Sequence, residues 1–288
     1  MTKISYRAFS LIELSIVILI VGILVAGVTT SSRLIIRMRL QTAQSITVSS
    51  PVNTVKDLVF WFETTLEKSF NDSEEQNNAF LTAWYDNNAQ SSLKYNVFTS
   101  ASTASQPKYI ENFFNGALPS VRFDGNDFFN IDGNIFVNTN FTIFVVERKN
   151  VAADLWIFHP LQACSTNECL HVGYRSDNNF SLAFYANDLD CNGSVSSSCS
   201  DLAGIKLRIH TMTFSKTAGK KYWLNGGVNP DAFDATQIAS ITTAKTGRIG
   251  GNYNGDLAEL IVFNRALNDE ERQAIESYLA KKYLLRIT

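Results

Sequence analysis

An almost unbroken apolar run, residues 9–28, lies close to the start of this chain. It has about 20 residues, which is the length that a helix needs to cross the hydrocarbon core of a bilayer. Lys3 and Arg7 precede it, and basic residues on that side favour a cytoplasmic location for the first segment. The run therefore predicts a transmembrane helix, whose apolar part ends at residues 29–32.

Glu13 stands near the beginning of this apolar run. An ionised carboxylate in hydrocarbon costs roughly 3 kcal/mol on insertion scales, so a carboxylate there indicates a function. An ordinary signal peptide is the alternative, with residues 29–32 as the small residues at which a peptidase would cut. A simple anchor or signal peptide has no use for Glu13, and this residue therefore favours a more specialised N-terminus.

Residues 8–14, Ala-Phe-Ser-Leu-Ile-Glu-Leu, resemble the signature of type IV prepilins. The resemblance implies that a prepilin peptidase removes residues 1–8 by cutting between Ala8 and Phe9, and that Phe9 is then N-methylated. The family nearly always has glycine where this chain has Ala8. It also implies subunit assembly in which Glu13 faces the amino terminus of a neighbouring pilin subunit, where a cation makes a buried carboxylate tolerable.

The rest of the chain has the pattern of antiparallel β structure. With 45% hydrophobic and 12% aromatic residues it can bury a sizeable core. Short apolar or alternating segments separated by turn residues predict strands at 58–62, 80–85, 120–123, 141–146, 155–158, 170–174, 180–185, 205–214, 221–224 and 258–263. Polar residues 41–56 predict the break between the first helix and this domain. Asn268 and Glu271 form a capping-box pattern that predicts one closing helix.

Several of these segments resemble concanavalin A-like domains of laminin-G type. The matching pieces recur in the family's order at 58–62, 84–86, 119–125, 141–146 and 255–267. The resemblance implies a two-sheet jelly roll. We therefore predict a mainly β fold in which a transmembrane, pilin-type helix precedes an antiparallel jelly-roll β-sandwich with a C-terminal helix. The predicted divisions are a leader at 1–8, the helix and linker at 9–50 and the sandwich at 55–288.

Four cysteines form two close groups, Cys164 with Cys169 and Cys191 with Cys199. The N-terminus indicates export, and exported domains form disulfides. The spacing favours two local loops, although four cysteines allow three connectivities and a crossed pairing is also open. Free thiols in a cytosolic protein are the remaining alternative.

Enzymatic chemistry has little support in the sequence. Glycoside hydrolysis usually needs two carboxylates across the scissile bond, and the Glu-x-Asp-x-x-Glu spacing of some jelly-roll hydrolases does not occur here. Asp256 and Glu259 are the nearest pair, and they belong to the strand motif of the resembled family. We therefore predict that the chain is not an enzyme.

Clustered oxygen ligands suggest a Ca2+ site. Asp124 and Asp127 are one candidate pair, and Asp188 and Asp190 are another. The alternative is that these residues form turns, which aspartate favours without any metal.

Ligand binding by aromatic stacking is the last candidate activity. Trp156 and Trp223 are the candidate ligand-binding residues, and the cysteine-containing segment 160–203 is the candidate surface. The alternative is that both tryptophans belong to the core. The net charge of −2 gives no reason to expect a nucleic-acid partner.

These features predict a minor type IV pilin or pseudopilin that presents a lectin-like domain for adhesion. The expected partners are other pilin subunits, the prepilin peptidase, the bacterial inner membrane, and a glycan or cell-surface protein. The protein would lie in the inner membrane before assembly and afterwards in the periplasm or at the cell surface. Two alternatives remain, a structural pseudopilin of a type II secretion-like system without a ligand and a membrane-tethered carbohydrate-active enzyme.

Overall fold

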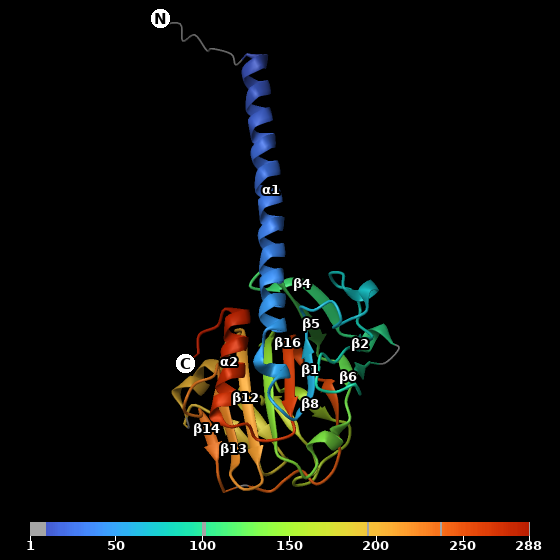
Figure 1. Ribbon diagram of the computed structural model, residues 1–288, viewed down its shortest axis with the longest axis vertical. Coiled ribbons are helices and arrows are strands. Elements are labelled where there is room, and N and C mark those ends of the chain that lie inside the picture. The colour runs from blue at the N-terminus through green and yellow to red at the C-terminus, as the bar shows by residue number, and fades with distance from the viewer. Residues whose placement is uncertain (1–9, 100–101, 195, 237, 288) are drawn as a thin grey trace, which may run out of the picture.

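A long helix projects from one end of a two-layered β domain (Figure 1). The structure is a computed structural model that describes residues 10–99, 102–194, 196–236 and 238–287. The α-helices are α1 (Leu11–Val48) and α2 (Asp269–Tyr283). Short 3-10 helices occur at Pro51–Asn53, Asp72–Glu74, Thr103–Ser105, Gly133–Phe136 and Ser197–Ala203.

The β domain consists of two eight-stranded antiparallel sheets, called here sheet A and sheet B. Sheet A contains β1 (Leu58–Glu63), β4 (Lys108–Phe114), β5 (Leu118–Asp124), β7 (Phe141–Lys149), β12 (Arg208–Ser215), β13 (Gly219–Leu224), β14 (Ala232–Asp234) and β16 (Asn254–Phe263). Sheet B contains β2 (Ala83–Trp84), β3 (Val97–Phe98), β6 (Phe128–Asn130), β8 (Leu155–Pro160), β9 (His171–Tyr174), β10 (Phe180–Ala183), β11 (Leu189–Cys191) and β15 (Thr246–Gly250). The predicted mainly β fold between an N-terminal and a C-terminal helix is confirmed.

Strand order explains why some segments are apolar throughout. In sheet A the order is β14-β13-β12-β7-β16-β5-β4, and β1 also pairs with β16. Strand β7 is central, and its side chains are buried on both faces. Ile143 and Val145 join the core between the sheets, while Phe144 and Val146 pack on the outer side of sheet A. A strand buried on both faces reads as a continuous apolar run.

Helix α2 covers the outer face of sheet A. Its residues Ile275 and Leu279 are fully buried in the same cluster as Phe144 and Ile261. Asn268 and Glu271 form the predicted capping box at its start. The helix thus supplies the apolar layer that this face of the sheet needs.

The break between the first helix and the sandwich lies within the predicted segment 41–56, near the end of that segment. Helix α1 continues through Val48, and it ends at Ser49, just before the turn that begins at Pro51. The polar residues before Ser49 remain helical because the helix docks on the sandwich there, with Ala43 and Thr47 buried. Tertiary packing rather than composition therefore sets the end of the helix.

The predicted strand boundaries also change. The segment predicted at 80–85 contributes only β2. Strand β12 begins at Arg208, so Ile205 lies outside it and is half exposed. Pairing with β7 starts at Arg208, and pairing partners rather than the local alternation define the strand.

Candidate functional site

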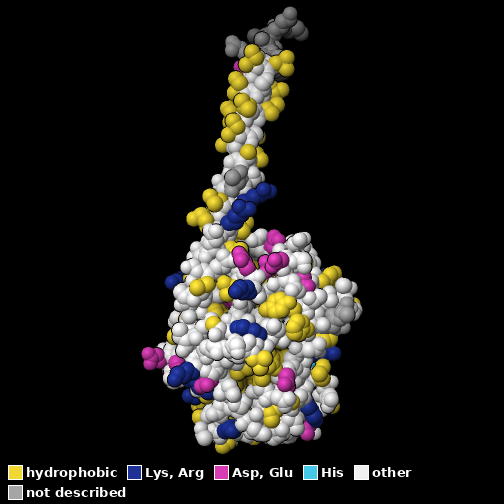
Figure 2. All heavy atoms as spheres, turned by 45° about the vertical axis from the view of Figure 1, so that its right-hand side comes forward, with side chains coloured by type: hydrophobic (Ala, Val, Ile, Leu, Met, Phe, Trp, Pro, Cys, Tyr) yellow, Lys and Arg dark blue, Asp and Glu magenta, His cyan; other side chains and the backbone are white. Residues whose placement is uncertain are grey.

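The membrane-facing candidate site is the first half of α1. Its large apolar residues from Leu11 to Val28 are each at least half exposed. Figure 2 shows them covering the helix on the visible face, with basic side chains nearer the sandwich. Within the described residues, α1 is the one helix long and apolar enough to cross a membrane. So much exposed apolar surface requires a bilayer or neighbouring helices around it.

Glu13 takes part in the cap of α1. Its carboxylate accepts a hydrogen bond of 2.9 Å from the backbone N–H of Ser10, and the Ser10 hydroxyl accepts one of 3.2 Å from the N–H of Ile12. This capping box satisfies backbone donors at the start of the helix. The predicted cleavage and methylation positions, Ala8 and Phe9, lie outside the described residues.

The second half of α1 docks on the sandwich through one stripe. Ala43 and Thr47 are buried, and Leu40 packs against the same apolar cluster. The Gln44 side chain donates to the backbone carbonyl of Thr65 at 2.9 Å. This spacing of three and four residues places the contacts on one side of the helix.

Next to this contact lies a fully buried charged cluster. The Lys282 ammonium is 2.9 Å from a carboxylate oxygen of Glu63 and 3.0 Å from one of Glu259. The Trp61 indole and the Tyr278 hydroxyl donate to Glu259 at 2.6 and 2.7 Å. Burial opposes the charge on Glu63, but Lys282 and hydrogen bonds from Thr65 outweigh it, and its pKa is lowered. The cluster joins β1, β16 and α2, and it gives Glu259 a structural role.

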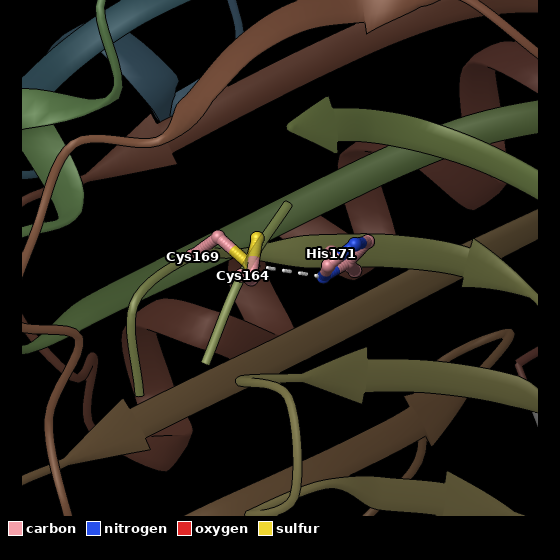
Figure 3. A group of neighbouring side chains, drawn as sticks. All are labelled: Cys164, Cys169 and His171. Atoms are coloured by element: carbon pink, nitrogen blue, oxygen red, sulfur yellow. Dashed lines mark hydrogen bonds between the residues drawn. A yellow bond between two sulfur atoms is a disulfide. The ribbon is translucent and has the colours of Figure 1, made fainter. Parts of the chain in front are cut away.

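Both local disulfides are present, Cys164–Cys169 and Cys191–Cys199. This resolves the connectivity that the sequence left open. Figure 3 shows His171 beside the first disulfide, with its Nδ1 3.5 Å from the sulfur of Cys169. The three side chains are close enough together to hold a metal. However, disulfide sulfurs are not thiolates, and thiolate is the form of cysteine that binds metals.

On the outer face of sheet B, four paired residues form a row that crosses strands β8 to β11. Trp156 on β8 pairs with Gly173 on β9, Gly173 with Ser181 on β10, and Ser181 with Asp190 on β11. Their neighbours along the strands point inward to the core, so these four positions share the outward face. A Cβ on Gly173 would lie 2.1 Å from the Leu155 carbonyl oxygen, so only glycine allows β8 and β9 to approach this closely.

A pocket of about 220 Å³ opens on this face, and we call it the sheet B pocket. It is lined by Trp156, His171, Arg175, Ala183, Tyr185 and Asp188. The Arg175 guanidinium lies 2.6 Å from Asp188 and 2.8 Å from Asp190, and its Nε–H also donates to the Ser181 hydroxyl at 3.0 Å. These bonds fix Arg175 across the turn between β10 and β11.

His171 is the titratable base of the sheet B pocket. Burial disfavours its charged form, and His159 adds a smaller effect in the same direction, so its pKa falls to about 4. Its ring lies edge-on to that of Trp156, with centroids 5.1 Å apart. His171 is therefore neutral near pH 7.

The two candidate calcium-binding pairs have other partners in the structure. Asp188 and Asp190 pair with Arg175, which already supplies their cation. Asp127 accepts a hydrogen bond of 2.9 Å from the backbone N–H of Asp124 in a turn, and burial raises its pKa to about 7. Asp124 and Asp127 thus have the arrangement of the turn alternative, Asp188 and Asp190 are ion-paired, and the Ca2+ site stays a prediction.

The two candidate tryptophans have different surroundings. Trp156 lines the sheet B pocket. Trp223 lies on β13 with 2% of its surface exposed, and the guanidinium of Arg272 covers it at 4.0 Å from the ring. We therefore correct the assignment of Trp223, whose ring is covered by α2 and is closed to a ligand.

Sequence reasoning missed Arg175 and Tyr185 and gave His171 no role. Alternation provided a signal, because Val172 and Tyr174 belong to the core between the sheets. His171 and Arg175 must then point the other way. Their position beside Trp156 depends on strand pairing, which the local pattern does not contain.

A second polar cluster lies inside the sandwich. The Glu147 carboxylate accepts from the Tyr174 hydroxyl at 2.6 Å and lies 3.0 Å from Nε2 of His210. All three side chains are fully buried. Burial lowers the pKa of His210 and favours its neutral form. These groups resemble an acid–base set, but they have no surface at which a substrate could meet them.

Comparisons with known proteins found similarity only at the level of structure. No family model matches the chain, and no curated protein matches it. A sialidase from Trypanosoma rangeli matches with 12% identity and a TM-score of 0.49 over 80% of this chain and 34% of its own. A botulinum neurotoxin type C structure, whose title links cell entry to two ganglioside molecules, matches with 14% identity and a TM-score of 0.49 over 80% and 53%. The chain spans about a third of the sialidase and half of the neurotoxin structure.

The prediction that the chain is not an enzyme is contradicted by this comparison. The similar structures include sialidases, among them a mutant that displays trans-sialidase activity, at 11% identity and a TM-score of 0.49 over 87% of this chain and 39% of its own. The prediction relied only on a missing pair of carboxylates, and some glycosidases do not use such a pair. Likeness at this level of identity concerns the fold alone, so it assigns no activity to this chain.

Proposed function

We propose that this chain is a pilin-type subunit, anchored in the bacterial inner membrane by α1, whose sandwich recognises carbohydrate outside the cytoplasm. The observation that carries the proposal is the division of one continuous helix. Its first half presents apolar side chains all around, and its second half docks on the sandwich. Such a helix suits both a bilayer and a bundle of identical helices.

Processing at the N-terminus would release the subunit for assembly. Removal of residues 1–8 would leave Phe9 as the first residue, close to Glu13. In the structure the Glu13 carboxylate accepts a hydrogen bond from the backbone N–H of Ser10. In an assembled bundle it would instead pair with the amino terminus of a neighbouring subunit. A cation in the low dielectric of the bundle offsets the desolvation of that carboxylate.

The two disulfides support an extracytoplasmic location for the sandwich. Cys169 directly precedes β9 and Cys191 lies on β11, so each disulfide is attached to a strand beside the sheet B pocket. Disulfides persist in oxidising compartments such as the periplasm and the cell surface. A braced open face is suited to recognition of a glycan or another surface ligand.

A second candidate function is that of a membrane-tethered carbohydrate-active enzyme. The observation that favours it is the grouping of Tyr185, Asp188 and His171 around one pocket. Tyrosine, aspartate and histidine are residue types that serve as nucleophile, acid or base. Release of a chromogenic phenol from aryl glycosides, abolished by Asp188→Asn, would favour this second candidate.

The proposal is tested by the mass and N-terminal sequence of the protein purified from native membranes. We expect a chain that begins at N-methylated Phe9. In parallel, Glu13→Val should leave the protein in the membrane but prevent its recovery in sheared surface filaments. A chain that begins at Met1, or that is cut near residues 29–32, would overturn the pilin part of the proposal.

A further inference from the structure

We propose that the sheet B pocket binds one ring of an uncharged saccharide. The inference deepens the proposed recognition function, on which it rests, by naming the site and the class of ligand. The pocket lies on the one outer sheet face that α2 does not cover, so a ligand can reach it without displacing a packed element.

The shape of the pocket follows from side-chain size. Ala183 is a small residue in a lining whose other members, including Trp156 and Tyr185, are larger. At about 220 Å³ the hollow is below the range of pockets for drug-sized ligands, which suits a single sugar ring. Arg175 lies 5.7 Å from the Trp156 ring and closes the side nearest β11.

Charge in the pocket excludes acidic ligands. Arg175 carries one positive charge, and its two carboxylate partners, Asp188 and Asp190, more than offset it. His171 contributes no positive charge near pH 7, because burial lowers its pKa to about 4. A carboxylate or phosphate ligand would enter a site of net negative charge, and this is repulsive.

Polar and aromatic groups in the pocket match the two surfaces of a sugar. Among the residues that the structure describes, one carboxylate oxygen of Asp188 accepts from the Phe184 backbone N–H at 2.8 Å and the other from the Arg175 guanidinium at 2.6 Å. A carboxylate oxygen has a second lone pair, which can accept from a ligand hydroxyl. Tyr185, which is 52% exposed, offers an apolar ring face with a polar tip.

Stabilisation of the turn between β10 and β11 does not explain why the large side chain of Tyr185 is exposed. The ion pairs account for Arg175 and both aspartates, since they hold the β10–β11 turn. They do not require a large aromatic side chain at the rim of the hollow. A binding role accounts for Tyr185, while the ring of Trp156 is largely buried and forms part of the pocket lining.

The test uses the full chain in detergent micelles, with saturation-transfer NMR and titration calorimetry. The probes are methyl glycosides of glucose, galactose, mannose and N-acetylglucosamine, together with glucuronate and sialic acid as acidic counterparts. We expect binding of at least one neutral glycoside and none of the acids. Tyr185→Ala should weaken that binding roughly tenfold, which corresponds to about 1.4 kcal/mol.

The matched control is Phe98→Ala, which removes another half-exposed aromatic side chain of sheet B far from the pocket in the strand order. It should leave the affinity unchanged. Asp188→Asn, with its fold checked by circular dichroism, should also weaken binding. Failure of every neutral glycoside to bind, preference for an acidic sugar, or equal affinity in Tyr185→Ala and Phe98→Ala would overturn the inference. Processing at Phe9 is measured separately, so the pilin proposal can stand if this site fails.

Discussion

The two outer faces of the sandwich differ in what covers them. The outer face of sheet A is closed by α2 and by the docked end of α1, and Lys282, Glu63 and Glu259 are completely buried there. The outer face of sheet B is open, and its charged residue Arg175 remains about one-third exposed beside the pocket. Closure removes water from charges on one face, and openness leaves similar charges accessible on the other.

This difference teaches where substitutions act on stability and where they act on binding. On the closed face each charged group depends on a protein partner, because no water can replace it. On the open face water competes for every ion pair and reduces its contribution to stability. The predictions below measure that contrast.

The largest effect is expected from Lys282→Met. The substitution leaves Glu63 and Glu259 facing each other without their cation, and loss of one partner from a buried ion pair costs about 3–5 kcal/mol. The control is Lys281→Met on the exposed side of the same helix. Denaturant unfolding of the full chain in micelles gives both free energies. Equal values for the two variants would refute the closed-face explanation.

A smaller loss of stability is expected from Gly173→Ala. Its Cβ would lie 2.1 Å from the Leu155 oxygen and 2.7 Å from Cα of Trp156, so β8 and β9 must separate. Overpacking of this kind costs about 1–3 kcal/mol. Gly193→Ala is the control, because its nearest neighbour would be the Ser200 Cβ at 3.9 Å. If both variants unfold at the same temperature, the strands do not approach as closely as the structure shows.

The smallest effect is a pH dependence from His171. Its pKa is about 4 in the folded protein, against an ordinary value of 6.5, because of burial and the charges of His159 and Arg175, with Asp188 acting in the opposite direction. The unfolded chain therefore binds more protons below pH 6.5, and stability falls as pH decreases toward 4. In His171→Gln the fall in melting temperature between pH 7 and 4 should be shallower than in the unsubstituted chain. An identical slope would show that His171 is not desolvated.

Much of the fold could be predicted from local sequence. Continuous apolar runs gave the strands of sheet A that are buried on both sides, as at 141–146 and 258–263. Short segments separated by turn residues gave β9 and β10 near 170–174 and 180–185, and the capping pair Asn268 and Glu271 marked the start of the last helix. These signals are local, and the physical rules behind them act within a few residues.

The sites were harder to predict because they depend on pairing between distant segments. Trp156 meets His171 and Tyr185 only after the register of β8, β9 and β10 is set. Lys282 lies between Glu63 and Glu259, which come from opposite ends of the sandwich sequence. No spacing motif records such contacts, whereas cysteine spacing favoured the two local disulfides without excluding a crossed pairing.

The continuity of α1 has a geometric consequence. A helix of 38 residues is about 57 Å long at a rise of 1.5 Å per residue, and its last turns are fixed to the sandwich by Gln44 and Thr47. The direction in which the sandwich faces is therefore set by the rotation of the helix about its own axis. Where neighbouring copies are related by a regular screw operation, each sheet B pocket is rotated about the screw axis by the same angle relative to the pocket of the preceding copy. A surface built this way would repeat its binding sites along a spiral without any contact between the sandwiches.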